Sequence, residues 1–224
     1  VQSWKDIFPK KGEIHFAGAL ENNEDTGTLQ YLASTAMEAG FSTRVLDMQA
    51  LDLQNGRFFD PAGELVNRCF KLYPWEWMVD ESPDGCLAEM EWLEPIWKLV
   101  MSNKAILATL YELFPDSPYV LPCYLSRPRS GLFCKKPIFS REGHNVSVVD
   151  IRDWEEYVRI AETEGDYNTG AYVYQEYVEP TAYSGRYPVI GSWIIGGEAA
   201  GIGIRENRME VTDNLSEFVP HIIG

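Results

Sequence analysis

Three cations stand close together in a chain that is otherwise strongly acidic. Lys135, Lys136 and Arg141 fall within seven residues, whereas the whole chain carries a net charge of −15. Small or turn-forming residues accompany them, namely Ser140, Gly143 and Asn145, and let backbone N–H groups approach an anion. A lysine acts as a point charge and an arginine as a bidentate fork, which together suit a polyphosphate. The alternative is a solvated basic turn of a hairpin.

A second arginine belongs to a glycine-rich hairpin. Gly196-Gly197 separates two apolar runs and predicts a tight turn. On the returning strand Gly201, Gly203 and Arg205 share one face, because side chains alternate. Two positions without side chains leave a shallow bay beside a fixed positive charge, and glycine inside a strand indicates close approach of a ligand or another backbone. A bulged strand with an exposed arginine explains the same pattern.

Other candidates carry less chemistry. Polar residues occur where a predicted strand ends and a helix begins, namely Asn22, Glu24, Asp25 and Thr26. This is a common ligand position in α/β folds. A helix-capping cluster explains the same residues equally well. The segment 73–77 is either an aromatic floor with one carboxylate or part of a core. His15, His144 and His221 are dispersed without a neighbouring nucleophile motif, so a hydrolytic triad has no support. Neither a Walker A loop nor G-x-G-x-x-G is present.

Composition excludes several classes of function. The 224 residues are 45% hydrophobic, with 34 Asp plus Glu against 19 Lys plus Arg, which suits a folded core and argues against a nucleic-acid-binding surface. No apolar run approaches the roughly 18–20 residues needed to cross a bilayer. Four widely spaced cysteines favour reduced thiols over zinc ligands, so we expect a cytoplasmic protein without membrane partners.

The elements that position these residues differ between the two halves. Strand-like residues 14–19, a helical repeat of apolar residues from Leu29 to Met37 and a strand over 43–48 form an α/β crossover unit. Asp25 or Thr26 is the predicted helix cap, and Gly40 the residue that ends the helix. Residues 95–114 predict a helix with an interruption near 102–104. After residue 133, β-branched runs separated by glycines predict a mainly antiparallel sheet, with one helix over 152–162.

Taken together, these segments resemble the synthetase portion of the glutathionylspermidine synthase family, an ATP-grasp family, and most closely its members without an amidase half. The matching stretches follow the family's order across nearly the whole chain: residues 24–32, 70–76, 102–107, 136–143 and 201–206. The resemblance implies an ATP-grasp fold preceded by part of a pre-ATP-grasp α/β domain. The expected division is residues 1–100 for the pre-ATP-grasp, substrate-side portion and 101–224 for the nucleotide-binding portion.

The resemblance also implies an ATP-dependent ligase that joins a small-molecule acid, such as a glutathione-like peptide, to a polyamine-like amine through an acyl phosphate. The residues that match nucleotide contacts are Lys104, Lys136, Glu142, Gln175, Glu176 and Tyr177. Arg141 and Arg205 match arginines that stabilise the transferring phosphoryl group, where negative charge spreads over three oxygens. Thr26 matches a contact to the peptide substrate.

One feature departs from the family pattern. The family's Mg²⁺ ligands are expected upstream of Val1, so this chain is interpreted as a C-terminal section, with no metal ligand assigned within it. Glu21-Asn22-Asn23 imitates a ligand pair, but it directly precedes the substrate-side segment and is not assigned to metal. A nucleotide-binding module that no longer catalyses remains the alternative to an active ligase.

Overall fold

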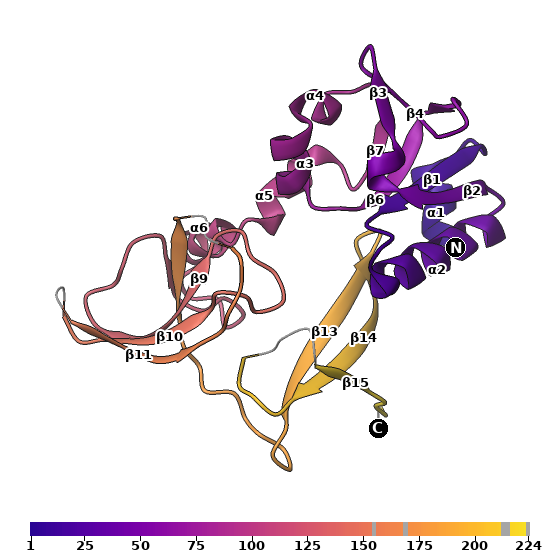
Figure 1. Cartoon of the computed structure of the whole chain (residues 1–224). Coiled ribbons are helices and arrows are strands. Elements are labelled where there is room, and N and C mark those ends of the chain that lie inside the picture. Colours follow the sequence, from indigo (N-terminus) through magenta and orange to yellow (C-terminus); the bar gives the residue numbers. More distant parts are fainter. Residues whose placement is uncertain (154–155, 168–169, 212–215, 223–224) are drawn as a thin grey trace. The chain divides into compact units, whose positions relative to one another are not determined.

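The computed structural model describes residues 1–153, 156–167, 170–211 and 216–222. The chain divides into two compact units, Val1–Leu99 and Val100–Gly224, and Figure 1 shows the elements of each. The interpretation of residues 1–100 and 101–224 as substrate-side and nucleotide-binding portions stays a prediction.

The first unit is built on a parallel sheet of four strands in the order β2-β1-β6-β7. Its β1 lies between two parallel neighbours, pairing His15 with Arg44 on one side and with Cys69 on the other. A small antiparallel sheet, β3-β4-β5, belongs to the same unit. The elements are α1 (Gln2–Ile7), β1 (Glu13–Gly18), α2 (Asn23–Glu38), β2 (Ser42–Asp47), η1 (Met48–Ala50), β3 (Asp52–Gln54), β4 (Arg57–Phe59), β5 (Leu65–Val66), β6 (Arg68–Leu72), α3 (Trp75–Glu81), α4 (Pro83–Cys86), β7 (Glu91–Leu93) and η2 (Ile96–Lys98).

The long helix α2 begins earlier than the sequence predicts. Asn22 is its N-cap, and the Asn22 side chain accepts a hydrogen bond from the backbone N–H of Glu24 at 2.8 Å. The predicted caps, Asp25 and Thr26, lie inside the first turn, so that assignment is wrong; Asn22 has the extended backbone that a cap requires. Gly40 follows the helix with a φ of +93°, which confirms its predicted role.

Side chains of β1 alternate between two cores. Ile14 and Phe16 pack with α1 and α2, including Trp4 and Leu29. Ala17 packs on the opposite face with residues of β4 and α3, such as Phe58 and Trp75. Trp75 is therefore core, which resolves the two interpretations of segment 73–77 in favour of packing for this residue. The burial of both faces explains why β1 is largely apolar.

The second unit contains an antiparallel sheet in the order β11-β10-β9-β12-β8 and a separate three-stranded sheet, β13-β14-β15. Its elements are α6 (Ala105–Leu113), β8 (Cys123–Tyr124), β9 (Gly131–Pro137), β10 (Ser147–Ile151), β11 (Tyr157–Glu162), β12 (Tyr172–Glu176), β13 (Tyr187–Ile195), β14 (Glu198–Asn207) and β15 (Glu217–Val219). The short helix α5 (Leu99–Ser102) ends before Asn103, which confirms the predicted interruption of the helix there.

The predicted helix over 152–162 is wrong in its described part. Residues Tyr157–Glu162 form β11, which pairs with β10 through a bulge beside Val148 and Val149. Residues 154–155 lie outside the described residues. Tertiary pairing with β10 overrides the local helical preference here.

The sheet β13-β14-β15 is joined by the turn that the sequence predicts. Gly196 and Gly197 have φ values of +62° and +85°, as a type I′ hairpin turn requires. Most of β13 is exposed to solvent. The chain is thus a mixed α/β protein with parallel and antiparallel sheets, as predicted, and among its described residues no helix is long and apolar enough to span a membrane.

Candidate functional site

On two neighbouring strands of the second unit, a lysine is hydrogen-bonded to the uncharged side chain of a glutamine. Lys136 on β9 and Gln175 on β12 lie on the same face of the sheet, because the register pairs Lys136 with Val173 and Gln175 with Cys134. The Lys136 Nζ donates to Gln175 Oε1 at 2.7 Å. Among the described residues no carboxylate forms an ion pair with Lys136. Its ammonium group is therefore oriented without being neutralised.

A second lysine connects the start of α6 to the end of β9. The Lys104 backbone N–H donates to the Ile138 carbonyl at 2.8 Å, and its Nζ donates to the Ser140 Oγ at 3.0 Å and to the Ser140 carbonyl. These contacts bring Lys104 to the residue directly before Arg141. The sequence contains Ser140 as a small loop residue, but nothing in its pattern indicates that it fixes Lys104.

The loop after β9 is held in a defined shape. Glu142, Gly143 and Asn145 all have positive φ values. The Asn145 side chain fixes the loop to residues 165–167, since its Nδ2 donates to the Gly165 carbonyl and its Oδ1 accepts from the Tyr167 N–H, both at 2.8 Å. Arg141 and Glu142 are exposed on this loop. The structure thus places the predicted loop residues next to Lys104.

The segment 175–177 uses two of its backbone donors inside the protein. The Glu176 N–H donates to the Pro122 carbonyl at 2.8 Å, and the Tyr177 N–H donates to the Leu132 carbonyl at 3.0 Å. The Tyr177 hydroxyl donates to Glu210 Oε2 at 2.7 Å, and this bond is the main reason that the pKa of Tyr177 is raised. A proline at position 176 would break the bond to Pro122 whether or not a nucleotide binds.

Two thiols lie near Lys136. Burial raises the pKa of both Cys123 and Cys134, while the positive charge of Lys136 acts in the opposite direction. The net pKa increase keeps both thiols protonated near neutral pH, so they serve as packing groups rather than nucleophiles.

Arg205 belongs to the other sheet of the second unit. Its guanidinium carbon lies 5.7 Å from the centre of the Phe218 ring, and among the described residues no carboxylate forms an ion pair with it. A Cβ added to Gly203 would come within 3.7 Å of Phe218 and 3.9 Å of Trp193, so two aromatic rings flank the glycine. Gly203 thus lies between two aromatic rings, and the bay for a ligand beside Arg205 stays a prediction. No described hydrogen bond or ion pair links Arg205 to Lys104, Lys136 or Arg141.

Thr26 lies in the first unit, in the first turn of α2. Its hydroxyl donates to the Leu20 carbonyl at 3.1 Å, which places it beyond the carboxyl end of β1, at the edge where parallel sheets bind ligands. In the same unit, a charge network surrounds Arg44, whose guanidinium donates to Glu13, Asp60 and Glu64. No pattern in the sequence predicts this network.

The described residues contain no group of three or more His, Cys, Asp or Glu side chains that could hold a metal ion. Within Glu21-Asn22-Asn23, the Asn22 side chain serves as the cap of α2.

The fold and these contacts define a mixed α/β protein with oriented cationic side chains suited to an anionic ligand. The chain belongs to the glutathionylspermidine synthase pre-ATP-grasp family, whose model matches residues 1–224. This match confirms the resemblance and supports the pre-ATP-grasp assignment.

Three curated relatives illustrate the family. The chain is 34% identical over 221 residues to the "Putative acid–amine ligase" of Haemophilus influenzae, covering 94% of this chain and 56% of that protein. It is 28% identical over 236 residues to the trypanothione synthetase of Crithidia fasciculata, covering 92% and 35%. It is 27% identical over 232 residues to the bifunctional glutathionylspermidine synthetase/amidase of Escherichia coli, covering 89% and 36%. The chain thus spans about half the length of the first relative and about a third of the others.

Proposed function

We propose that this chain is the nucleotide-binding and part of the substrate-binding portion of an ATP-dependent acid–amine ligase with an ATP-grasp fold. The observation that carries the proposal is the hydrogen bond between Lys136 and Gln175. It directs an un-neutralised ammonium group in a chain of net charge −15, within a family whose curated relatives include ligases by name. A cation that is oriented but not neutralised attracts an anionic ligand.

The ligase reaction requires two steps in this proposal. The substrate carboxylate attacks the γ-phosphorus of ATP, so that an acyl phosphate forms and ADP leaves. The amine then attacks the acyl carbon, an amide forms, phosphate leaves and a proton is released from the amine. Lys104 and Lys136 bind the phosphates as point charges, whereas Arg141 and Arg205 follow the negative charge that spreads over the transferring phosphoryl group.

The remaining predicted residues take supporting roles. Glu142, at the tip of the loop after β9, lies on the nucleotide side, as do Gln175, Glu176 and Tyr177. Because the N–H groups of Glu176 and Tyr177 are already bonded inside the protein, we assign the adenine contact to the carbonyl groups of this segment and to the N–H of Val178. Thr26 is proposed to contact the acid substrate.

Substrates and metal belong to the same proposal. The acid is a glutathione-like peptide and the amine is polyamine-like, a pairing with which the excess of carboxylates is compatible. Mg²⁺ would neutralise phosphate charge, with ligands contributed from outside this chain, and we expect the ligase to act in the cytoplasm. A nucleotide-binding module without catalysis is the second candidate, and it differs from the ligase in binding ATP without amine-dependent ADP release.

The test measures ATP binding and amine-dependent ADP release by the full-length protein, with glutathione and spermidine as substrates. Lys136→Met should weaken ATP binding by about 10–100-fold, the scale of a charge-assisted hydrogen bond. Lys5→Met, at an exposed lysine of α1, is the matched control and should leave binding unchanged. ATP binding without amine-dependent ADP release would support the non-catalytic module. Unchanged ATP affinity in Lys136→Met would reject the site.

A further inference from the structure

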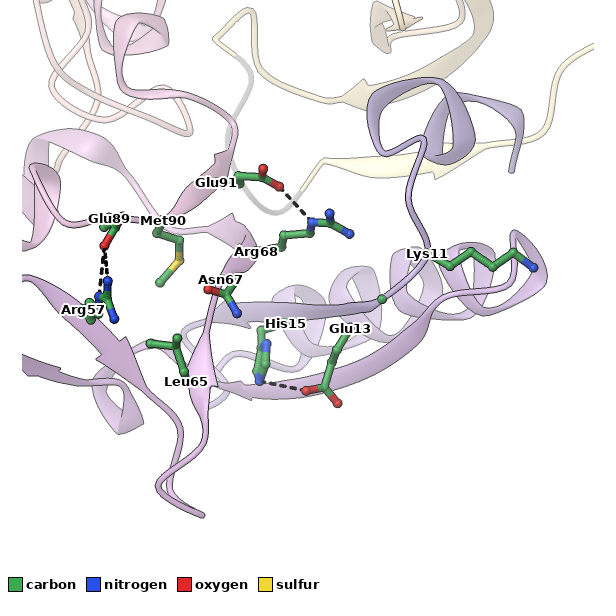
Figure 2. Close-up of a pocket in the computed structure, with 11 residues that line it drawn as sticks. Lys11, Glu13, His15, Arg57, Leu65, Asn67, Arg68, Glu89, Met90 and Glu91 are labelled. Carbon is green, nitrogen blue, oxygen red and sulfur yellow. Dashed lines mark hydrogen bonds and ion pairs between the residues drawn. The ribbon is translucent and has the colours of Figure 1, made fainter.

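A cleft of about 710 Å³ opens in the first unit at the amino ends of β1, β6 and β7. Figure 2 shows the side chains that line it. Thr26 follows the opposite, carboxyl end of β1, so this cleft is separate from the substrate-side position of the proposed ligase. Its volume falls in the range of sites for small molecules, roughly 300–1,000 Å³.

The base of the cleft contains a histidine with unsatisfied hydrogen-bonding capacity. His15 is 2% exposed, and neither ring nitrogen has a partner in good hydrogen-bond geometry, although the Arg68 backbone lies close enough to oppose the lowering of the His15 pKa. The Nε2 atom lies 3.8 Å from Glu13 and 3.9 Å from Asp60, beyond hydrogen-bonding distance. Buried polar groups almost always have a partner, whether protein, water or ligand. The free volume beside His15 is where that partner belongs.

The nearby carboxylates are committed to another residue. Arg44 donates to Glu13 at 2.8 Å and to Asp60 at 2.5 Å, and Asp60 also accepts the backbone N–H groups of Ala62 and Glu64. Burial lowers the pKa of His15, with the two carboxylates opposing this effect only in part. The imidazole is therefore neutral near pH 7 and offers one donor and one acceptor.

The rim of the cleft carries both signs of charge. Arg57 pairs with Glu89 and Arg68 with Glu91, each at 2.8 Å. The first pair is well exposed, with side chains 53% and 76% accessible, and such pairs contribute little stability. A ligand can therefore replace Arg57 or Glu89 in this pair at small cost, whereas Arg68 is only 19% exposed and is held in place by a hydrogen bond to the Lys10 carbonyl at 2.9 Å. Lys11 also lines the cleft, but its ammonium group points away from the other side chains (Figure 2).

We propose that this cleft binds a short zwitterionic peptide. The guanidinium groups of Arg57 and Arg68 receive its carboxylate, Glu89 and Glu91 receive its ammonium group, and a peptide amide supplies the acceptor and donor that His15 lacks. An ion of one sign would leave half of the rim unmatched, whereas a zwitterion matches both halves. The proposal stands independently of the ligase reaction, because it needs neither ATP nor the second unit.

The experiment is calorimetric titration of glycylglycine into the full-length protein without ATP. N-acetylglycine, which lacks the ammonium group, and glycinamide, which lacks the carboxylate, are the comparison ligands. We expect glycylglycine to bind at least about tenfold more tightly than either, since each loses one charge-assisted contact. Equal affinity for all three, or no binding of glycylglycine, would overturn the proposal.

Variants locate the binding. Arg57→Gln and Glu89→Gln change exposed rim residues and should each weaken glycylglycine binding by about tenfold or more. Arg159→Gln is the matched control, because Arg159 forms a similar exposed ion pair with Glu162 in the second unit. Thr26→Val separates this cleft from the proposed ligase site. Binding lost in Thr26→Val but retained in Arg57→Gln would assign the peptide to the ligase site and overturn the cleft.

The imidazole provides a direct readout. In protein labelled with ¹³C at the histidine rings, glycylglycine should shift the His15 resonance, identified by its loss in His15→Gln. An unchanged His15 resonance at saturation would show that the partner of the ring is water and would overturn the proposal. This measurement remains decisive even if His15→Gln is less stable than the parent protein, because the shift is observed in the parent.

Discussion

The cleft of the first unit and the candidate nucleotide site of the second unit use positive charge in opposite ways. Around the cleft, each arginine is bonded to carboxylates: Arg44 to three of them, Arg57 to one and Arg68 to one. In the second unit, Lys136 is bonded to an amide oxygen and Arg205 lies against an aromatic ring. In the first arrangement a ligand would have to replace an internal ion pair, whereas in the second no ion pair to a carboxylate occupies Lys136 or Arg205 among the described residues.

The sheet that contains β1 and the sheet that contains β13 also differ in how far their side chains are buried. Phe16 on β1 is completely buried, whereas Ile190 on β13 is 66% exposed. A strand covered on both faces stabilises the unit, and a strand exposed over most of its length contributes little as the chain stands. The parallel sheet of the first unit is thus covered more completely than β13-β14-β15, which carries Arg205, while the second unit has a buried core of its own around Val149, Ile151 and Val173.

The first prediction compares the loss of stability when a buried and an exposed apolar side chain are shortened. Phe16→Ala should lower the free energy of unfolding by about 3–5 kcal/mol, because it opens a cavity in a packed core. Ile190→Ala in the same chain should cost less than about 0.5 kcal/mol, as at other exposed positions. Denaturant unfolding of both variants provides the measurement. If Ile190→Ala lowers the free energy of unfolding by several kcal/mol, this expectation is wrong and β13 is covered in the folded protein.

The second prediction asks whether Arg205 accelerates phosphoryl transfer rather than only binding ATP. Arg205→Lys keeps the charge but loses the planar fork, so kcat of the full-length enzyme should fall by roughly 10–1000-fold, the scale of a lost transition-state donor. The KM for ATP should change much less. Steady-state measurement of amine-dependent ADP release gives both values. An increase in KM at unchanged kcat would make Arg205 a ground-state binding residue instead.

The third prediction asks whether ATP binding requires that the hydrogen-bond partner of Lys136 is uncharged. Gln175→Glu places a carboxylate where the amide stands, so Lys136 becomes paired as the arginines of the cleft are. ATP binding by the full-length protein should weaken by at least about tenfold, since the new charge also repels phosphate. Gln175→Leu removes the hydrogen bond without adding charge and should have the smaller effect. If both variants bind ATP equally well, charge pairing is irrelevant at this position.

The smallest expected effect concerns pH and the cleft. Burial lowers the folded-state pKa of His15 from 6.5, against the opposing charges of Glu13 and Asp60 and in the same direction as Arg44. The neutral ring therefore contributes stability that is fully present above pH 6.5 and is lost as pH falls through the folded-state pKa. Asp60, whose pKa is lowered from 3.8 chiefly by the Glu64 N–H, responds only in more acidic solution.

Unfolding midpoints measured between pH 7.5 and pH 5 should consequently decline in the parent protein and decline less in His15→Gln. Parallel decline in both would show that other groups, not His15, govern stability in this interval.

Local patterns predicted local structure well. Gly40 ends α2, and Gly196-Gly197 turns the hairpin, because only glycine adopts positive φ without strain. The prediction of a helix over 152–162 was wrong for residues 157–162. Their apolar residues fit both the period of a strand and that of a helix, and only the pairing with β10 selects the strand. Asn22 was missed as a cap because Asp25 and Thr26 offer the same chemistry three and four residues later.

The sequence indicated which residue types could form the candidate site, whose role stays a prediction, but it could not indicate their contacts. Lys136 and Gln175 lie 39 positions apart, and the register that joins them is fixed by the whole sheet. The cleft around His15 left a weaker signal, a polar residue between Ile14 and Phe16 in an apolar strand. Of the two nearby carboxylates, Glu13 lies on the same strand as His15, but Asp60 follows β4 much later in the chain, so sequence spacing could not place it beside the ring.

The parallel arrangement of β2, β1, β6 and β7 also determines how the first unit assembles. Its pairs join positions far apart, such as Glu13 with Ser42 and His15 with Cys69, whereas β13 and β14 meet across a single turn at Gly196-Gly197. A hairpin of that kind closes in roughly 1–10 μs, while long-range pairings form slowly because loop-closure entropy is lost first. We therefore expect the exposed apolar hairpin to form while the sheet that carries His15 is still incomplete.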